Sequence, residues 1–108
     1  MARSYEIIPT GLVIWSVGGG KYVGAIRDRR IVERLKPLDG QRVALRVQGI
    51  VLTVRVTTRR VNNNEYVVFF LPRSLNPTWS WLRAHGEVNA EVIIPHDEMG
   101  LVVINDGG

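Results

Sequence analysis

One pattern of residues occurs twice along this chain, and it constrains the fold more than any other feature. In each copy a strand, a short helix, a Gly turn and an alternating strand follow one another. The first copy ends in the segment 35–47 and the second in the segment 82–92. Two copies of a half-barrel motif predict a pseudo-duplicated barrel, with repeat 1 at about 12–48 and repeat 2 at about 50–94.

The expected fold is a single, mainly β domain made of two ββαβ halves with two short helices. A length of 108 residues fits one domain. An OB-like or Sm-like small barrel is the alternative architecture. The remaining segment, 95–108, is acidic, and a last short strand is expected at Leu101 to Ile104.

Each predicted helix has its own start and stop signals. Asp28 is a good N-cap for a helix over Arg29 to Leu35. Asn76 as N-cap and Pro77 at the first helical position begin the second helix, which Gly86 ends.

The strand over 42–48 alternates between apolar and polar residues, and the parity reverses after Gly49. A shift by one residue turns every side chain to the other face, so one straight strand cannot keep both apolar sets inside. We therefore predict a turn or bulge here, with Gly49 and Ile50 as a tight hairpin. The apolar strand from Glu65 to Leu71 is expected to be buried on both faces.

The repeat resembles the cradle-loop barrels, which include double-psi barrels and the AbrB-like swapped-hairpin DNA-binding domains. Residues 23–47 and 67–92 carry the resemblance. In the AbrB-like half a strand ends in a Leu-Pro or Ile-Pro step before the short helix, and Leu71-Pro72-Arg73-Ser74-Leu75 matches this step. The first copy departs from it, since Ile26-Arg27-Asp28 stands where the Pro would be.

The resemblance implies a fold more than an activity. Its wider group contains DNA binders, substrate-recognition domains of ATPases, and enzymes. In the AbrB-like proteins the arginines that contact DNA lie in and around the loop before the short helix. That implies a role for the cluster formed by Arg27, Arg29 and Arg30, whose other interpretation is a solvated helix start with local pairing to Asp28.

Charge is distributed unevenly along the chain. Residues 1–86 contain all 14 Lys and Arg and five acids, a balance of 14 − 5 = +9, whereas residues 87–108 contain five acids and no Lys or Arg. A basic body attracts polyanions through counterion release. The acidic end could shield that surface, pair with a neighbouring subunit, or only solubilise the tail.

The hairpin around Gly49 is the main candidate site. With Gly49-Ile50 as its turn, Arg46 would face Thr53, Ala44 would face Arg55, and Arg42 would face Thr57. This places three arginines on one outward face and continues to two more at its end: Arg42, Arg46, Arg55, Arg59 and Arg60. Such a basic ribbon can lie along phosphates. The alternative is an ordinary solvated barrel exterior, where edge charges block aggregation.

Trp81 is the candidate for a protein interaction. It lies off the apolar face of its helix, about 200° from Trp79 at ~100° per residue. It is either an exposed anchor for a partner or, together with Trp15 and Trp79, part of the packing at the barrel ends, and we favour packing because large aromatic residues in small domains are usually buried.

Other chemistry finds little support. Gly18-Gly19-Gly20-Lys21 lacks the spacing and the following helix of a phosphate loop, so a hairpin loop is expected. His85 and His96 do not have a known metal-ligand spacing. No nucleophile has an evident base. We expect no enzyme activity, no metal and no cofactor.

The sequence therefore predicts a small nucleic-acid-binding protein, a DNA-binding regulator or chromosome-associated factor, with DNA, in duplex form, more expected than RNA. A homo-oligomer, a dimer, is expected. The alternative is a protein-interaction or structural module that uses Trp81 and the acidic end. Without an apolar leader or a membrane-spanning run, a cytoplasmic location and no membrane partner are expected. The absence of Cys fits an intracellular protein, and also one from a thermophile.

Overall fold

The computed structural model describes residues 3–97, and they form a mainly β fold with two short helices. The strands are β1 (Arg3–Gly18), β2 (Lys21–Ile26), β3 (Arg42–Val47), β4 (Ile50–Arg55), β5 (Thr57–Val61), β6 (Asn64–Phe70) and β7 (Glu87–Asp97). The helices are α1 (Arg29–Leu35) and α2 (Asn76–Arg83), accompanied by the single 3₁₀ turns η1 (Lys36–Leu38) and η2 (Arg73–Leu75).

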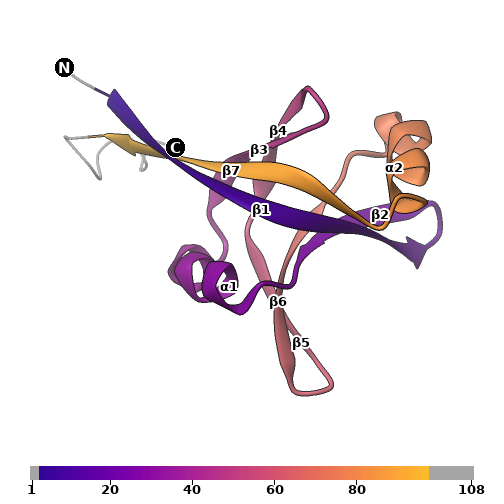
Figure 1. Cartoon of the computed structure of the whole chain (residues 1–108), viewed down its shortest axis with the longest axis horizontal. Coiled ribbons are helices and arrows are strands. Elements are labelled where there is room, and N and C mark those ends of the chain that lie inside the picture. The colour runs from indigo at the N-terminus through magenta and orange to yellow at the C-terminus, as the bar shows by residue number, and fades with distance from the viewer. Residues whose placement is uncertain (1–2, 98–108) are drawn as a thin grey trace.

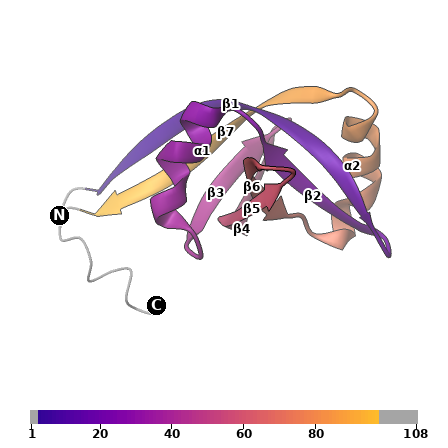
Figure 2. The same cartoon turned by 90° about the horizontal axis from the view of Figure 1, so that it is seen from below.

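All described strands belong to one antiparallel sheet in the order β4-β3-β7-β1-β2-β6-β5. The long strand β1 pairs with β7 along its first part and with β2 along its last part. The sheet curls into a half-barrel (Figures 1 and 2), which confirms the mainly β class. A closed barrel is not what these residues form, since β4 and β5 are the two edges.

The inner face of the curled sheet holds the core. Alternate residues of the strands point to this face, among them Leu12, Leu45, Phe69 and Val92, and all four are fully buried. The helices close over it, α1 through Val32 and Leu35 and α2 through Trp79 and Leu82. The Trp79 indole N–H donates to the Pro72 carbonyl at 2.8 Å, which satisfies its polar atom inside the core.

Helix α1 begins and ends as predicted. The Asp28 carboxylate accepts from the Arg30 backbone N–H at 2.9 Å and caps the helix. The predicted cap of α2 is wrong, because Asn76 is the first residue of the helix and its side chain donates to the Gly20 carbonyl at 2.7 Å. This bond ties α2 to the β1–β2 turn.

Two tight turns define the β3–β4 and β5–β6 hairpins. The β3–β4 turn consists of Gln48 and Gly49, with φ of 51° and 77°, and the β5–β6 turn of Asn62 and Asn63, with φ of 51° and 69°. Positive φ at both central residues is typical of a type I′ turn. The hairpin predicted at residue 49 is therefore confirmed, with its turn one residue earlier than expected.

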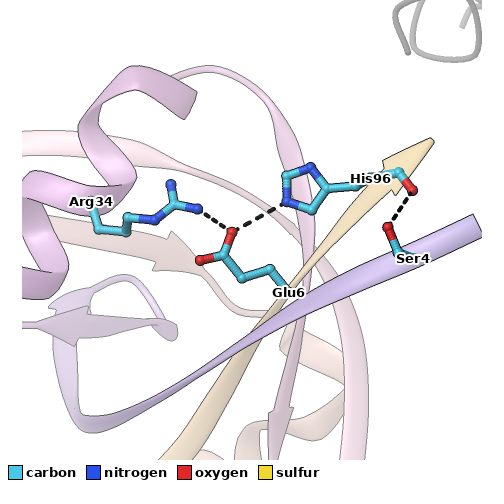
Figure 3. A network of polar contacts seen from close by, with 4 residues as sticks. All are labelled: Ser4, Glu6, Arg34 and His96. Carbon is cyan, nitrogen blue, oxygen red and sulfur yellow. Dashed lines mark hydrogen bonds and ion pairs between the residues drawn. The ribbon is translucent and has the colours of Figure 1, made fainter. Parts of the chain in front are cut away.

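A polar network fixes α1 to the free ends of β1 and β7 (Figure 3). Arg34 of α1 donates to a Glu6 carboxylate oxygen, which also contacts His96 Nε2 at 3.2 Å. The Ser4 hydroxyl donates to the His96 carbonyl at 3.5 Å. Within residues 3–97 no helix is long and apolar enough to cross a membrane. The predicted strand at 101–104 and most of the acidic segment lie outside the described residues.

Candidate nucleic-acid interface

The β3–β4 hairpin carries three arginines on its outer face, as predicted. Arg42 and Arg46 alternate with the buried Val43, Leu45 and Val47. Across the ladder the register differs from the predicted one. Arg42 lies directly opposite Arg55, Ala44 opposite Thr53, and Arg46 opposite Val51. Because the turn lies one residue earlier than predicted, the β4 residue opposite each β3 residue changes by two positions. A change of two positions keeps the same face, so Arg42, Arg46 and Arg55 still point outward.

Arg42 and Arg55 form no ion pair with any residue that the structure describes. Arg55 Nη1 donates to the Gly40 carbonyl at 2.9 Å, which positions its guanidinium at the base of the hairpin. Like charges directly opposite on two strands destabilise a sheet. The hairpin therefore presents two adjacent cations at a cost to its own stability.

The third arginine of this face is neutralised. Arg46 Nε donates to a Glu91 carboxylate oxygen on the neighbouring strand β7 at 2.7 Å. Glu91 comes from the second half of the chain, 45 positions away, so the sequence pattern gave no sign of this contact. The ribbon free to meet a phosphate is thus smaller than predicted.

Arg59 and Arg60 do not continue the ribbon. They lie on β5, at the other edge of the sheet, and Figure 1 shows the β5–β6 hairpin pointing away from β3–β4. The ion pair between Arg60 Nη2 and Glu65 spans 3.5 Å. Arg59 lies on the opposite face of β5 from Arg60, and its guanidinium carbon is 5.9 Å from the centre of the Phe70 ring. This distance is that of a cation–π contact.

The second predicted cluster lies at the start of α1 and borders an open cleft of about 920 Å³. Arg27 and Arg29 line this cleft together with Arg60, which the sequence did not place near them. Four carboxylates line it as well: Asp28, Glu33, Glu65 and Glu87. Mixed charge makes the cleft a poor site for a polyanion.

Ion pairs occupy most of this cluster. Arg27 is 3.8 Å from Glu87, and the 4.0 Å pair of Arg30 with Asp28 is loose because the Arg30 side chain is 93% exposed. Arg29 has no ion pair among the described residues.

Lys36 and Glu65 form an ion pair beside the cleft, and each shifts the pKa of the other. Lys36 Nζ donates to a Glu65 carboxylate oxygen at 3.0 Å. This hydrogen bond lowers the pKa of Glu65 below its usual value and raises the pKa of Lys36. Glu33, 3.6 Å from Lys36, raises the lysine pKa further. The pair fixes the end of α1 to β6.

The three tryptophans have three different environments. Trp79 is fully buried, whereas Trp81 is 58% exposed, so the expected packing of Trp81 in the core is wrong. The Trp81 ring lies 4.2 Å from the His85 ring. Trp15 is half-buried, and its ring meets the Tyr66 ring edge-on, with centroids 5.3 Å apart.

The sequence analysis missed an aromatic face on the outer side of the sheet. The pairing register places Trp15, Val23 and Phe70 in one row and Ala25 and Val68 in the next. Val23, Ala25 and Val68 are buried although they lie outside the main core.

Phe70, expected to be buried, is 51% exposed. The alternation of side chains along β6 could have revealed this face in the sequence. Tyr66, Val68 and Phe70 lie on one side of the strand, and Val67 and Phe69 lie on the other.

Comparison with protein-family models, with curated proteins and with solved structures finds no match to this chain.

Proposed function

We propose that this protein binds nucleic acid, DNA rather than RNA, through the outer face of the β3–β4 hairpin. The observation that carries the proposal is the pair formed by Arg42 and Arg55, directly opposite each other and without an ion-pair partner among the described residues. We place it in the cytoplasm as a regulator or chromosome-associated factor.

The physical argument concerns where the cations are unpaired. An arginine already bonded to a carboxylate must give up that contact before it binds a phosphate, and Arg46, Arg60, Arg27 and Arg30 are in this position. Arg42 and Arg55 lose nothing of this kind, and a phosphate between them would relieve their mutual repulsion. They therefore have the most to gain from a polyanion.

The test is fluorescence anisotropy with labelled oligonucleotides at low salt. The double variant Arg42→Gln, Arg55→Gln should bind at least about tenfold more weakly, since hydrogen bonds to charged groups contribute about 1.5–3 kcal/mol each. The matched control is Arg73→Gln, Arg83→Gln, which removes the same charge near α2 and should change binding much less. Equal losses in both variants would mean that net charge alone drives binding, and parental binding by the ribbon variant would move the site elsewhere.

We also infer a homo-oligomer, most simply a dimer. The outer face of the paired ends of β1 and β7 exposes Tyr5 and Ile7 beside Ile93 and Pro95. An apolar patch of this kind on a sheet is common at subunit interfaces. Ile7→Glu should reduce the mass measured by sedimentation to that of one chain if this patch joins two copies.

We infer, further, that the two halves arose by duplication, as a cradle-loop barrel would require. Gly40 and Gly86 are 46 positions apart, and we take this as the offset between the two halves. With this offset Val23 corresponds to Phe69, and Phe70 corresponds to Gly24. The β2–β6 pair Val23–Phe70 therefore maps onto another pair of the same ladder, Gly24–Phe69. The same offset converts Ala44–Ile93 into Val47–Ala90. Both ladders thus support a pseudo-twofold axis. The two hairpins before the helices do not share this offset, which explains why the repeat is weak in the sequence.

Trp81 supports a second candidate function, a protein-interaction module. Its exposed indole beside His85 forms a large apolar surface on a helix, typical of an interface anchor. A partner retained after nuclease treatment and lost on Trp81→Ala would favour this function over nucleic-acid binding.

A further inference from the structure

We infer that the aromatic face on the outer side of β1, β2, β6 and β5 binds the unpaired bases of single-stranded nucleic acid. The face is defined by Trp15, Tyr66, Phe70 and Arg59. This inference rests on the proposed function and specifies that the nucleic acid is single-stranded.

The first step of the argument is the arrangement of the rings. Trp15 on β1 and Tyr66 on β6 meet edge-on at 5.3 Å, and this contact lies across the intervening strand β2. Beneath them Val23, Ala25 and Val68 are at most 5% exposed. The rings thus rest on a packed layer, which holds them in place without a ligand. A rigid aromatic surface binds a flat base at a low cost in entropy.

The second step concerns Phe70 and Arg59. Phe70 is the last residue of β6 and remains 51% exposed, although it pairs with the buried Val23 of β2. The Arg59 guanidinium carbon lies over its ring, 5.9 Å from the ring centre. A planar cation beside an exposed ring can stack on a base and contact its phosphate.

The third step is the charge of the surroundings. Arg59 has no ion pair among the described residues. Tyr66 also lines the cleft of mixed charge at the start of α1, where Arg29 is a second arginine without an ion pair among the described residues. A polyanionic chain with exposed π-faces matches this combination of rings and arginines.

A duplex does not fit the same face. The bases of a duplex are stacked inside it and present only their edges to a protein. Aromatic side chains on a sheet bind bases that are splayed out of a single strand. The arginine ribbon alone favoured duplex DNA, and the aromatic face changes that expectation to a single strand.

The experiment compares one labelled twelve-nucleotide single strand with its duplex in fluorescence anisotropy. The parent should bind the single strand more tightly. Phe70→Ala should weaken single-strand binding about tenfold or more, in line with the loss of one stacked base, and should leave duplex binding within about twofold. The matched control is Trp81→Ala, which removes a similarly exposed aromatic residue on α2 and should change neither affinity.

A second readout does not depend on the stability of Phe70→Ala. In a Trp81→Phe background, Trp15 and the buried Trp79 are the only tryptophans left to contribute tryptophan fluorescence. Titration with the single strand should quench Trp15, and Trp15→Phe should abolish the change. Quenching absent at saturating oligonucleotide would overturn the inference.

The outcomes separate this inference from the proposed function. Tighter duplex binding, or a Phe70→Ala variant that holds the single strand as well as the parent, overturns the inference and leaves the proposed function standing. Absence of binding to either form at low salt overturns both. A dimer that Phe70→Ala dissociates, with single-strand binding unchanged, would assign the face to a second copy of the chain.

Discussion

The hairpins β3–β4 and β5–β6 are alike in sequence character and differ in what their arginines meet. Both have a two-residue turn with positive φ, and both carry arginines on an edge strand. In β3–β4, Arg55 faces another arginine. In β5–β6, Arg59 lies over a phenylalanine and Arg60 beside a glutamate. The cross-strand neighbour therefore decides whether an arginine is available to a phosphate, a base or neither.

The largest expected effect separates the two sides of β6. Phe69 is fully buried in the core, so Phe69→Ala should destabilise the fold by about 3–5 kcal/mol. Phe70→Ala, on the outer side, should cost much less. Urea unfolding of both variants checks this difference. Similar losses of unfolding free energy would show that the outer side of β6 is part of the structural core.

The arginine pair gives the next prediction, in which stability and binding change in opposite directions. Arg42→Glu turns a like-charge pair into an ion pair with Arg55 and should raise the free energy of unfolding by about 0.2–1 kcal/mol. The same variant should bind oligonucleotides more weakly than the parent. Thermal unfolding and anisotropy on one preparation measure both. A variant that loses stability would show that the two guanidinium groups do not repel each other in the parent.

A smaller effect is expected at the turn of the arginine hairpin. Gln48 adopts φ of 51°, a left-handed conformation that Asn tolerates better than Gln. Gln48→Asn should therefore stabilise the fold by less than about 1 kcal/mol, since the full left-handed cost is about 1–2 kcal/mol. The β5–β6 turn already has Asn at both positions, and Asn62→Gln should show the reverse change. A loss of stability in Gln48→Asn would contradict the assigned turn.

The smallest expected effect is the pH dependence of stability that arises from the ion pair between Lys36, at the end of α1, and Glu65 of β6. The lowered pKa of Glu65 contributes stability above its usual value of 4.5, and this contribution is lost as the pH falls below that value. The raised pKa of Lys36 contributes stability below 10.5, which is lost as the pH rises further. Both groups are solvated, so the change is small. Urea unfolding across the acidic range should show a shallower decline for Glu65→Gln than for the parent.

The local sequence pattern was enough to predict much of the β3–β4 hairpin. Alternation through Val43, Leu45 and Val47 and its reversal after Gly49 fixed which side the arginines occupy, whatever the turn residue. Asp28 correctly marked the start of α1. These features depend on neighbours along the chain, which a single sequence displays.

Strand order was beyond local pattern, and the errors about the arginine ribbon trace back to it. Arg59 and Arg60 follow Arg55 closely in sequence, yet β5 pairs with β6 at the opposite edge of the sheet. The Arg46–Glu91 bond exists only because β3 adjoins β7. The exposure of Phe70 could not be predicted from the apolar run in β6. A strand that is buried on both faces and a strand that carries an exposed aromatic face have the same composition.

The salt dependence of oligonucleotide binding tests the central claim most directly. The logarithm of the association constant should fall linearly with the logarithm of the salt concentration. In Arg42→Gln, Arg55→Gln the slope should be smaller by about 1.4 on a single strand or about 1.8 on a duplex, the value for two lost phosphate contacts. A slope that the two substitutions leave unchanged, or an affinity independent of salt, would contradict the account.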